Sequence, residues 1–537
     1  MKKNYIKIAL LLFSTILAAQ KSKLNNDYIS YFENTREIPF LHLNKTSFLK
    51  GEEIWFKAYI QEQNSRKLHP TTTNLYVSIF EESGNLKDQQ LIHIKEGMGS
   101  GSIDIDSTYT NGNYYLKAST NWMKNFKEDN SFNQKIKIIS SLKSTKKLTR
   151  NKGSYEFKLF PEGGYIIENT NNNLGILIKD YTGKGIKIDK GIIRNKSNNT
   201  VRFFKTNSFG LGNVNLYFNK NDIYEFEVLL ENGISIKANP PIAKEKGLAM
   251  RVVNSNPKFL SITLNTNNNS LKSLNKSNFK VLIHNTRKYR NYNFKINNSN
   301  TKYSLLINKN ELPSGINIIT LFDKNNTPIL ERLIFINNDS LFAKINIEKK
   351  SYGKDSLEIK LSNLTNDEIY LSSSFLPGAT KSYKPQNNIT TNFIFKPFVK
   401  GDIENANYYF KDINLKKLRD LDLLLITQGW SKYNWNNIFN KPPKRNFNFE
   451  NGIDIITRFN KSIKKNQSIL LFSKENNLVR IFKPIENKWT LQKSFIKKNS
   501  VLKCALKNKE GDLSKIAPTI SYSSGKISDS FNIKERT

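Results

Sequence analysis

Hydrophobic and polar residues alternate in short runs along most of the chain, and turn residues separate these runs. Residues 40–43 and 53–59 form two such runs around a turn that contains Gly51, a residue free of the Cβ penalty in turns. Residues 75–80 and 112–118 repeat the pattern. Alternation with a period of two predicts strands, and the close spacing of the turns favours β-sandwiches over a parallel sheet with helices.

The length of the chain predicts several sandwiches in tandem. Its 537 residues are too many for one core, because a sandwich of this kind takes about 100 residues. We therefore expect a mainly β protein of tandem immunoglobulin-like β-sandwiches. The expected units are 36–143, 151–245, 247–340, 341–440 (a sandwich plus a helix) and 446–537 (a fifth sandwich with a flexible tail).

One segment, near 414–428, has the period of a helix. Its leucines recur every three or four residues: Leu415, Leu418, Leu421 and Leu425. Asn414 is placed to cap this helix and Gly429 to end it. We expect its leucine face to pack on a sandwich, and a partner-binding helix is the alternative. Residues 369–374, which precede it, have the alternation of another strand.

The first twenty residues have the pattern of a signal peptide. Lysines at positions 2, 3 and 7 accompany an apolar run at 8–17, and small residues follow at Ala18 and Ala19. A buried N-terminal helix is the alternative. No later apolar run is long enough to cross a bilayer, so we expect no transmembrane segment after cleavage of the signal. The expected location is the periplasm or the outer membrane, including the cell surface.

The net charge of +38 raises the question of a nucleic-acid partner. Only 14 of the 84 basic residues are arginine, and the lysines are spread along the chain. Recognition of phosphates and bases depends strongly on arginine, so we expect a solvated basic surface and no specific nucleic acid. A weak, salt-sensitive attraction to anionic polymers stays open. The single cysteine, Cys504, excludes an intrachain disulfide and is expected to be a small core residue.

No motif for catalysis, cofactor binding or metal binding is evident. The four histidines include no pair at i and i+4, and there is no Gly-x-Ser-x-Gly elbow or phosphate-binding loop. His42 and His284 lie in apolar runs and are expected to be structural. Asp402 and Glu404 could orient a loop or bind a cation, and a structural turn is favoured. Glu162 is also expected to lie in a turn.

The tryptophans are the remaining candidates for ligand contact. Trp55 and Trp122 lie in alternating or strand-flanking runs, and we expect them to anchor the core. Trp430 and Trp435 lie beyond the end of the expected helix. This position makes them candidates for a binding surface.

Several segments together resemble a known family. The stretch 41–59 resembles the second macroglobulin domain of alpha-2-macroglobulin-like proteins. The whole chain is similar to large exported proteins of Bacteroidota, many of which end in a TonB-dependent receptor plug domain. The segments that carry this likeness are 114–126, 160–164, 312–316 with 320–323 and 331–333, 401–405 with 408–410, and 427–435.

The resemblance implies macroglobulin-like sandwiches, but this chain lacks the thioester motif of covalent macroglobulins, since its only cysteine is Cys504. No plug domain is evident. We therefore expect a non-enzymatic envelope scaffold that binds a protein or polysaccharide through loops and strand edges. Two alternatives stay open. One is a non-covalent endopeptidase inhibitor that holds a protease. The other is an accessory to TonB-dependent uptake that contacts an outer-membrane barrel.

Overall fold

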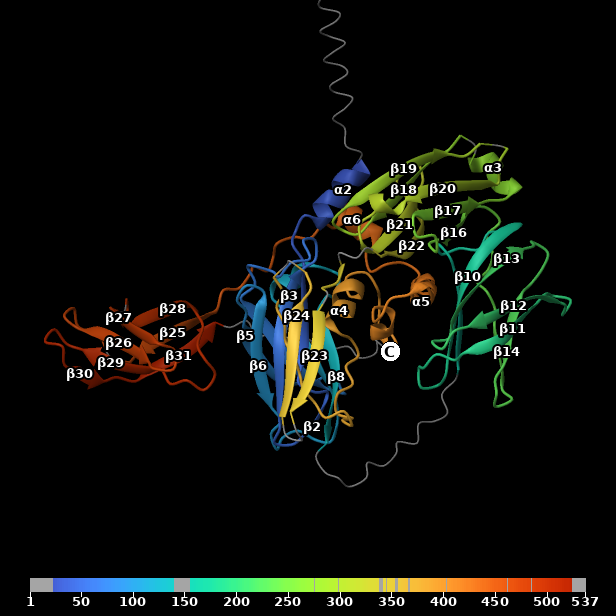
Figure 1. Ribbon diagram of the computed structural model, residues 1–537. Coiled ribbons are helices and arrows are strands. Elements are labelled where there is room, and N and C mark those ends of the chain that lie inside the picture. The colour runs from blue at the N-terminus through green and yellow to red at the C-terminus, as the bar shows by residue number, and fades with distance from the viewer. Residues whose placement is uncertain are drawn as a thin grey trace, which may run out of the picture.

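The computed structural model describes residues 23–139, 155–274, 276–297, 299–337, 341–343, 345–352, 356–365, 368–401, 403–460, 462–483 and 485–523. The expected signal peptide at 1–20 and the end of the expected tail lie outside these ranges. Strands make up most of the regular structure, and they form tandem β-sandwiches (Figure 1). The fold class predicted from the alternation is confirmed.

The first sandwich packs a three-stranded sheet on a five-stranded sheet. The three-stranded sheet has the order β1 (Glu37–Leu43), β3 (Glu53–Glu62), β6 (Met98–Asp104). The other has the order β2 (Ser47–Leu49), β8 (Phe132–Ile139), β7 (Gly112–Ser119), β4 (Asn74–Glu81), β5 (Leu86–His93), and the 3-10 turn η1 (Trp122–Asn125) follows β7. Ile54, Phe56 and Ala58 of β3 are buried while Trp55 is 60% exposed. The expected role of Trp55 as a core anchor is therefore wrong, because the pleat of β3 turns it to the outer face. Trp122 is buried as expected.

The second and third sandwiches follow the same plan. In the second sandwich, the first sheet has the strand order β13 (Leu211–Phe218), β10 (Thr170–Lys179), β9 (Glu156–Pro161). The second sheet has the order β12 (Thr200–Thr206), β11 (Ile188–Arg194), β14 (Glu225–Leu229), β15 (Ser235–Ala238). In the third sandwich, the first sheet has the strand order β16 (Ala249–Val253), β17 (Phe259–Asn265), β20 (Lys302–Asn308). The second sheet has the order β19 (Tyr289–Lys295), β18 (Asn278–His284), β21 (Gly315–Phe322), β22 (Pro328–Ile336). It also carries α3 (Asn268–Leu274) and η2 (Lys309–Glu311). Each has its own core of aliphatic and aromatic side chains between its two sheets.

The segment expected to be a fourth sandwich, 341–440, differs from that expectation. Its described part has one two-stranded sheet, β23 (Ile345–Tyr352) with β24 (Ser356–Asn363), followed by extended chain and short helices. Residues 369–374 are not a strand. Their serines instead hydrogen-bond to the first sandwich, where Ser372 Oγ lies 2.7 Å from His42 Nδ1 and Ser374 Oγ donates to Asn44 O. These side-chain bonds replace the ladder that a strand would need.

The predicted leucine helix is confirmed as α5 (Leu415–Thr427), whose first turn Asn414 caps by accepting from Lys417 N at 3.0 Å. It is one of several helices, since α2 (Lys23–Phe32), α4 (Ile389–Phe395), η4 (Ala406–Tyr409) and α6 (Trp435–Asn440) are also present. Buried side chains from these helices and from the second and third sandwiches form one shared core, which we call the hub. Figure 1 shows α4, α5 and α6 between the first three sandwiches.

The last sandwich lies beside the first in Figure 1. Its sheets have the orders β28 (Lys488–Ser494), β25 (Ile453–Phe459), β31 (Pro518–Ser523) and β27 (Leu478–Phe482), β26 (Ser468–Ser473), β29 (Lys503–Lys507), β30 (Leu513–Lys515). Cys504 is half-buried on β29. The preceding segment is held on the first sandwich, because Trp122 stacks on Phe449 at 4.2 Å and Tyr76 donates to Glu450 at 2.9 Å.

Candidate functional site

Three motifs that are far apart in the sequence meet where the second sandwich, the third sandwich and α5 come together. Residues 160–164 leave β9, Glu331 and Arg332 lie on β22, and Trp430 and Trp435 follow α5. Glu331 N donates to Gly163 O at 3.2 Å, which joins β22 to the first of these motifs. Three of the segments that carry the family likeness therefore form a junction between sandwiches.

A buried ion pair network holds this junction. Arg332 donates from Nε to Glu162 Oε1 and from Nη2 to Asp422 Oδ1 of α5, both at 2.8 Å. The Arg332 and Glu162 side chains are 2% and 0% exposed. Burial lowers the pKa of Arg332, but Asp422 and Glu162 outweigh burial and raise it, so the guanidinium stays charged. We call Glu162, Arg332 and Asp422 the ion lock.

Glu331, the neighbour of Arg332, holds the segment after α5. Its Oε1 accepts from Ser431 N at 2.6 Å, and its Oε2 accepts from Trp435 Nε1 at 3.0 Å. Burial raises the pKa of Glu331 against these hydrogen bonds. Trp435 is 3% exposed and is surrounded by hub side chains, so it anchors the junction.

The other candidates from the sequence lie around the junction. Trp430 is half-buried and lies against Gly164, where a Cβ would come 3.0 Å from the indole Nε1. Glu404 Oε2 accepts from Gly185 N at 2.9 Å, so it orients the turn between β10 and β11. Asp402 lies outside the described residues. Trp430 and Trp435 also line a cavity of about 660 Å³ together with the asparagine-rich turn 325–326.

The sequence reasoning missed the ion lock. Glu162 lies in a turn, as expected, but the sequence did not indicate that it is buried beside Arg332. A signal was present, because Glu331 and Arg332 stand inside a strand of otherwise apolar residues. Adjacent charges point to opposite faces of a strand, so in a buried strand each needs its own partner. The partners, however, come from positions that no local pattern connects.

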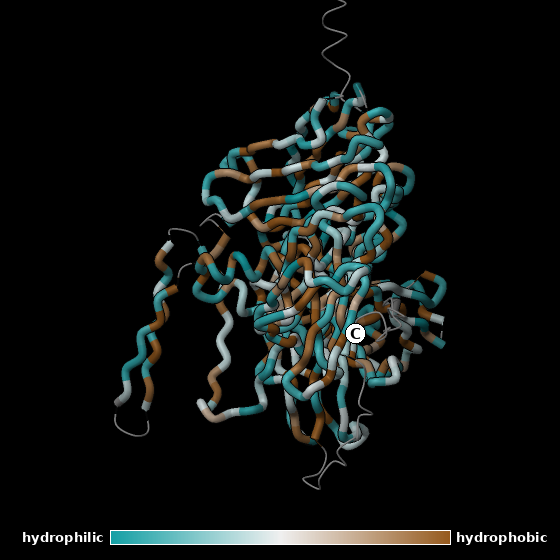
Figure 2. Tube along the Cα trace, turned by 90° about the vertical axis from the view of Figure 1, so that its right-hand side faces the viewer, coloured by the Kyte–Doolittle hydropathy of each residue, from teal (hydrophilic) through white to brown (hydrophobic). Residues whose placement is uncertain are grey.

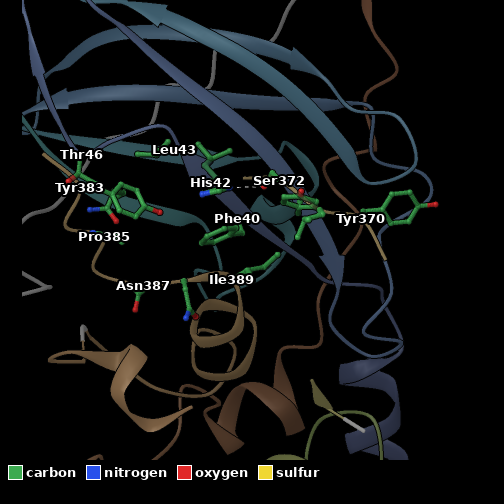
Figure 3. A pocket seen from close by; sticks show the side chains of 15 residues that line it. Phe40, His42, Leu43, Thr46, Tyr370, Ser372, Tyr383, Pro385, Asn387 and Ile389 are labelled. Carbon is green, nitrogen blue, oxygen red and sulfur yellow. Dashed lines mark hydrogen bonds between the residues drawn. The ribbon is translucent and has the colours of Figure 1, made fainter. Parts of the chain in front are cut away.

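A second cavity, of about 220 Å³, lies between β1 and the extended chain that precedes α4 (Figure 3). Its lining is mostly apolar and includes Phe40, Tyr383 and Ile389. The main chain also joins the two sides, since Thr46 N and Ser47 N both donate to Ser382 O. The extended chain thus packs along the first sandwich, and we call this contact the seam. The cavity is a space within the seam that side chains leave unfilled.

Figure 3 shows His42 and Ser372 facing each other across this seam. Their separation of 2.7 Å is that of a nucleophile and its base. Such a pair also needs a group that orients the imidazole, and none of the side chains that line the cavity is a carboxylate. Burial lowers the pKa of His42, which keeps the ring neutral as a hydrogen-bonding partner of the seam. We therefore assign the pair a structural role, as the sequence predicted for His42.

His284 also has the structural place expected for it. It is fully buried in contact with Tyr28 and Trp435, and burial lowers its pKa to about 3. Among the described residues, no cluster of three or more His, Cys, Asp or Glu side chains could hold a metal ion. In the same part of the chain, no helix has the length and apolar character needed to cross a membrane.

The hairpin of β23 and β24 exposes most of its described side chains to solvent. Its register places Ile347 opposite Leu361 and Ser351 opposite Leu357, so the apolar residues share one face. The side chain of Ile347 is 68% exposed, that of Leu361 is 39% exposed and that of Leu357 is 52% exposed. Lys349 also lies on this face, and the other charged residues occupy the opposite face, where Lys360 lies 3.9 Å from Glu348. Figure 2 shows this hairpin at its left, standing apart from the sandwiches.

Comparisons with known proteins give matches to solved structures alone. No family model and no curated protein matches the chain. Dimeric latent PorU from Porphyromonas gingivalis is 12% identical over 56% of this chain and 34% of that chain, with a TM-score of 0.28. Alpha-2-macroglobulin from Escherichia coli, activated by porcine elastase, is 9% identical over 91% and 43%, with a TM-score of 0.22. The chain thus spans less than half the length of either.

A tetra-tandem repeat from the extending region of a large adhesion protein is 9% identical over 91% of this chain and 99% of that chain, with a TM-score of 0.15. Alpha-2-macroglobulins are therefore among the structures that the chain is similar to. Identities this low concern the fold only. The class of protein defined by the sheets is a tandem β-sandwich scaffold, and the link to plug-bearing proteins of Bacteroidota stays a prediction.

Proposed function

We propose that the chain is a non-enzymatic, macroglobulin-like scaffold that binds an extended segment of a protein partner by strand addition at the β23–β24 hairpin. The observation that carries the proposal is the apolar face of this hairpin, which is exposed to solvent in the described structure. The scaffold is expected to act after export, in the periplasm or at the outer membrane.

The hairpin needs a partner for a physical reason. A two-stranded hairpin is only marginally stable in water, and a third strand or a packed face is needed for independent stability. In the described residues β23 and β24 pair only with each other, so each strand keeps one edge available for main-chain hydrogen bonds. An added strand pairs with such an edge, and its alternate apolar side chains extend the face of Ile347 and Leu361. The net charge of +38 favours an acidic partner.

The test compares two double variants in capture from a cell-envelope extract at low salt. Ile347→Lys with Leu361→Lys places charge on the apolar face, and we expect it to reduce captured partner about tenfold or more. Asn346→Lys with Ser362→Lys adds the same charge to the polar face and should leave capture unchanged. Hydrogen exchange should slow at the hairpin amides when the captured partner is added back.

The proposal fails if both variants capture the same partner equally, or if the hairpin amides exchange at the same rate with and without it. A captured protease that stays bound and cleaves the chain once would favour the endopeptidase-inhibitor alternative. A captured outer-membrane barrel would favour the uptake alternative. Either result would name the partner, and the hairpin variants would still decide the mode of binding.

A further inference from the structure

A third cavity, of about 640 Å³, opens between the second sandwich, the third sandwich and α5. Asn173 and Asn213 line it from β10 and β13, and the loop 254–257 lines it after β16. Lys309 fixes that loop, because its Nζ donates to Asn254 O at 2.8 Å and to Asn256 O at 2.6 Å. The volume is that of a site for a drug-sized ligand or a few side chains.

The charges around this cavity do not balance. Arg251 on β16 and Arg419 on α5 both line it with exposed side chains, and neither has an ion pair or hydrogen-bond partner among the described residues. The lining has one carboxylate, Asp422, and the ion lock already engages it through Arg332 at 2.8 Å. Two guanidinium groups without a partner in the described structure therefore line the cavity, one from β16 and one from α5, and planar guanidinium groups favour carboxylate or phosphate ligands.

The apolar part of the lining narrows the class of ligand. Leu415, at the start of α5, is 78% exposed, and Leu418 lies one turn further along the same wall. The one aromatic residue in the lining, Phe335, is 5% exposed. Sugars and nucleobases are usually held by stacking on exposed aromatic rings, and this cavity offers none. Aliphatic side chains next to guanidinium groups match a polypeptide that carries both apolar and acidic side chains.

We propose that this cavity binds an acidic, aliphatic-rich peptide segment of a partner protein. Arg251 and Arg419 take its carboxylates, and Leu415 and Leu418 cover its aliphatic side chains. This site is separate from the β23–β24 hairpin, and it goes beyond the function proposed above. Binding draws β16 and α5 to one ligand, so an occupied cavity adds a further link across the junction that the ion lock already holds.

A fluorescein-labelled peptide of alternating Glu and Leu tests the site by fluorescence anisotropy on the full chain. We expect binding at low salt that weakens as salt is added, since both cations are exposed to screening. Arg251→Gln and Arg419→Gln should each weaken binding about tenfold, because each removes a charge-assisted hydrogen bond. Arg458→Gln removes an exposed arginine of the last sandwich, on β25, and should leave binding unchanged.

The proposal is overturned if the double variant Arg251→Gln with Arg419→Gln binds the peptide as well as the unaltered chain does. It is equally overturned if a Gln-and-Leu peptide binds as tightly, or if polygalacturonate binds and the acidic peptide does not. Ile347→Lys with Leu361→Lys locates the binding. Unchanged affinity in that variant supports the cavity, and a loss would move the site to the hairpin, so failure here is distinct from failure of the strand-addition proposal.

Discussion

Glu37 is a carboxylic acid that the first sandwich buries almost completely at the start of β1. The hydroxyls of Thr72 and Thr120 donate to its two oxygens. Burial raises the pKa of Glu37 to about 7, and the two threonine hydrogen bonds only partly oppose burial. The folded chain therefore holds a proton here at pH values where the unfolded chain, with a pKa of 4.5, has released it.

This proton makes stability fall as pH rises. The folded state binds more protons than the unfolded state between about pH 4.5 and 7, so the free energy of unfolding decreases with pH across that window. The stabilisation is fully present below pH 4.5 and is lost as pH passes the folded value. We expect Glu37→Gln to remove about 3 kcal/mol of this dependence. Urea unfolding at several pH values between 4 and 8 measures it.

The control for this prediction is Glu53→Gln. Glu53 is an exposed acid on β3 of the same sheet. Its variant should keep the pH dependence of the unaltered chain. If Glu37→Gln also keeps that dependence, Glu37 is not the group that releases the proton.

At the scale of residues, the sequence predicted whether a side chain is buried better than it predicted which other side chain it contacts. The burial of Trp122, expected from the large area that an aromatic ring buries, is confirmed, and His284, expected to be structural because its run is apolar, is fully buried. Trp55 was misplaced because alternation gives two faces to a strand without saying which one is buried. The ion lock was missed because its partners are 90 and 170 residues apart in the chain. Side-chain pairs at such separations are set by the packing of sandwiches and leave no local pattern.

At the scale of elements, α5 was predictable because several signals agree. The leucine period, the cap at Asn414 and the glycine at 429 all indicate one helix. The segment 369–374 was not predictable as extended chain, because its alternation is that of a strand. An alternating segment becomes a strand only if its main chain pairs with a neighbouring strand. These residues are held on the first sandwich by hydrogen bonds of serine side chains.

The contact of α5 with β10 depends on a glycine. A Cβ at Gly175 would lie 2.3 Å from Ile426 Cγ2, so α5 can approach β10 this closely only at a residue without a side chain. We expect Gly175→Ala to reduce the free energy of unfolding by about 1–3 kcal/mol through overpacking. Urea unfolding measures the change.

The double variant Gly175→Ala with Ile426→Ala distinguishes overpacking from an effect of replacing the glycine in the backbone of β10. The added methyl group would occupy space that Ile426 gives up, so the double variant should lose less than the sum of the single changes. Gly112→Ala on β7 is the matched control, because no atom lies within 4 Å of the added Cβ. Strict additivity of the first pair would show that Gly175 and Ile426 are not coupled.

At the scale of the whole molecule, the hub and the ion lock join sandwiches that each have a core of their own. The sequence predicted the tandem plan from strand spacing. It did not predict the hub, which is assembled from helices and strands at distant positions. The described part of 341–440 contributes one exposed hairpin and most of the hub helices in place of the expected sandwich.

Substitution of Arg332 tests whether the ion lock holds the second sandwich, the third sandwich and α5 together. Arg332→Leu leaves Glu162 buried without its cation, and we expect a loss of about 3–5 kcal/mol in the free energy of unfolding. Arg332→Leu with Glu162→Leu removes the uncompensated charge as well, and should be more stable than the single variant. Calorimetry measures both the loss and any separation of the unfolding transition into steps.

Arg290→Leu is the control, since Arg290 is an exposed residue of β19 in the same sandwich. It should change stability by no more than about 0.5 kcal/mol. A single variant at Arg332 that unfolds like this control would show that the ion lock does not hold the junction together.

The position of α2 has a consequence for the order in which the chain can fold. Tyr28 and Phe32 of α2 pack against His284 and Tyr433, residues that are synthesised long after them. Until residues near 440 have followed, α2 lacks Tyr433 and the side chains of α6, although His284 of the third sandwich is already available to it. Contacts of such high sequence separation slow folding and leave apolar segments exposed meanwhile. The first described helix is therefore among the last elements that can reach its native place, and the cores of the separate sandwiches can form before it.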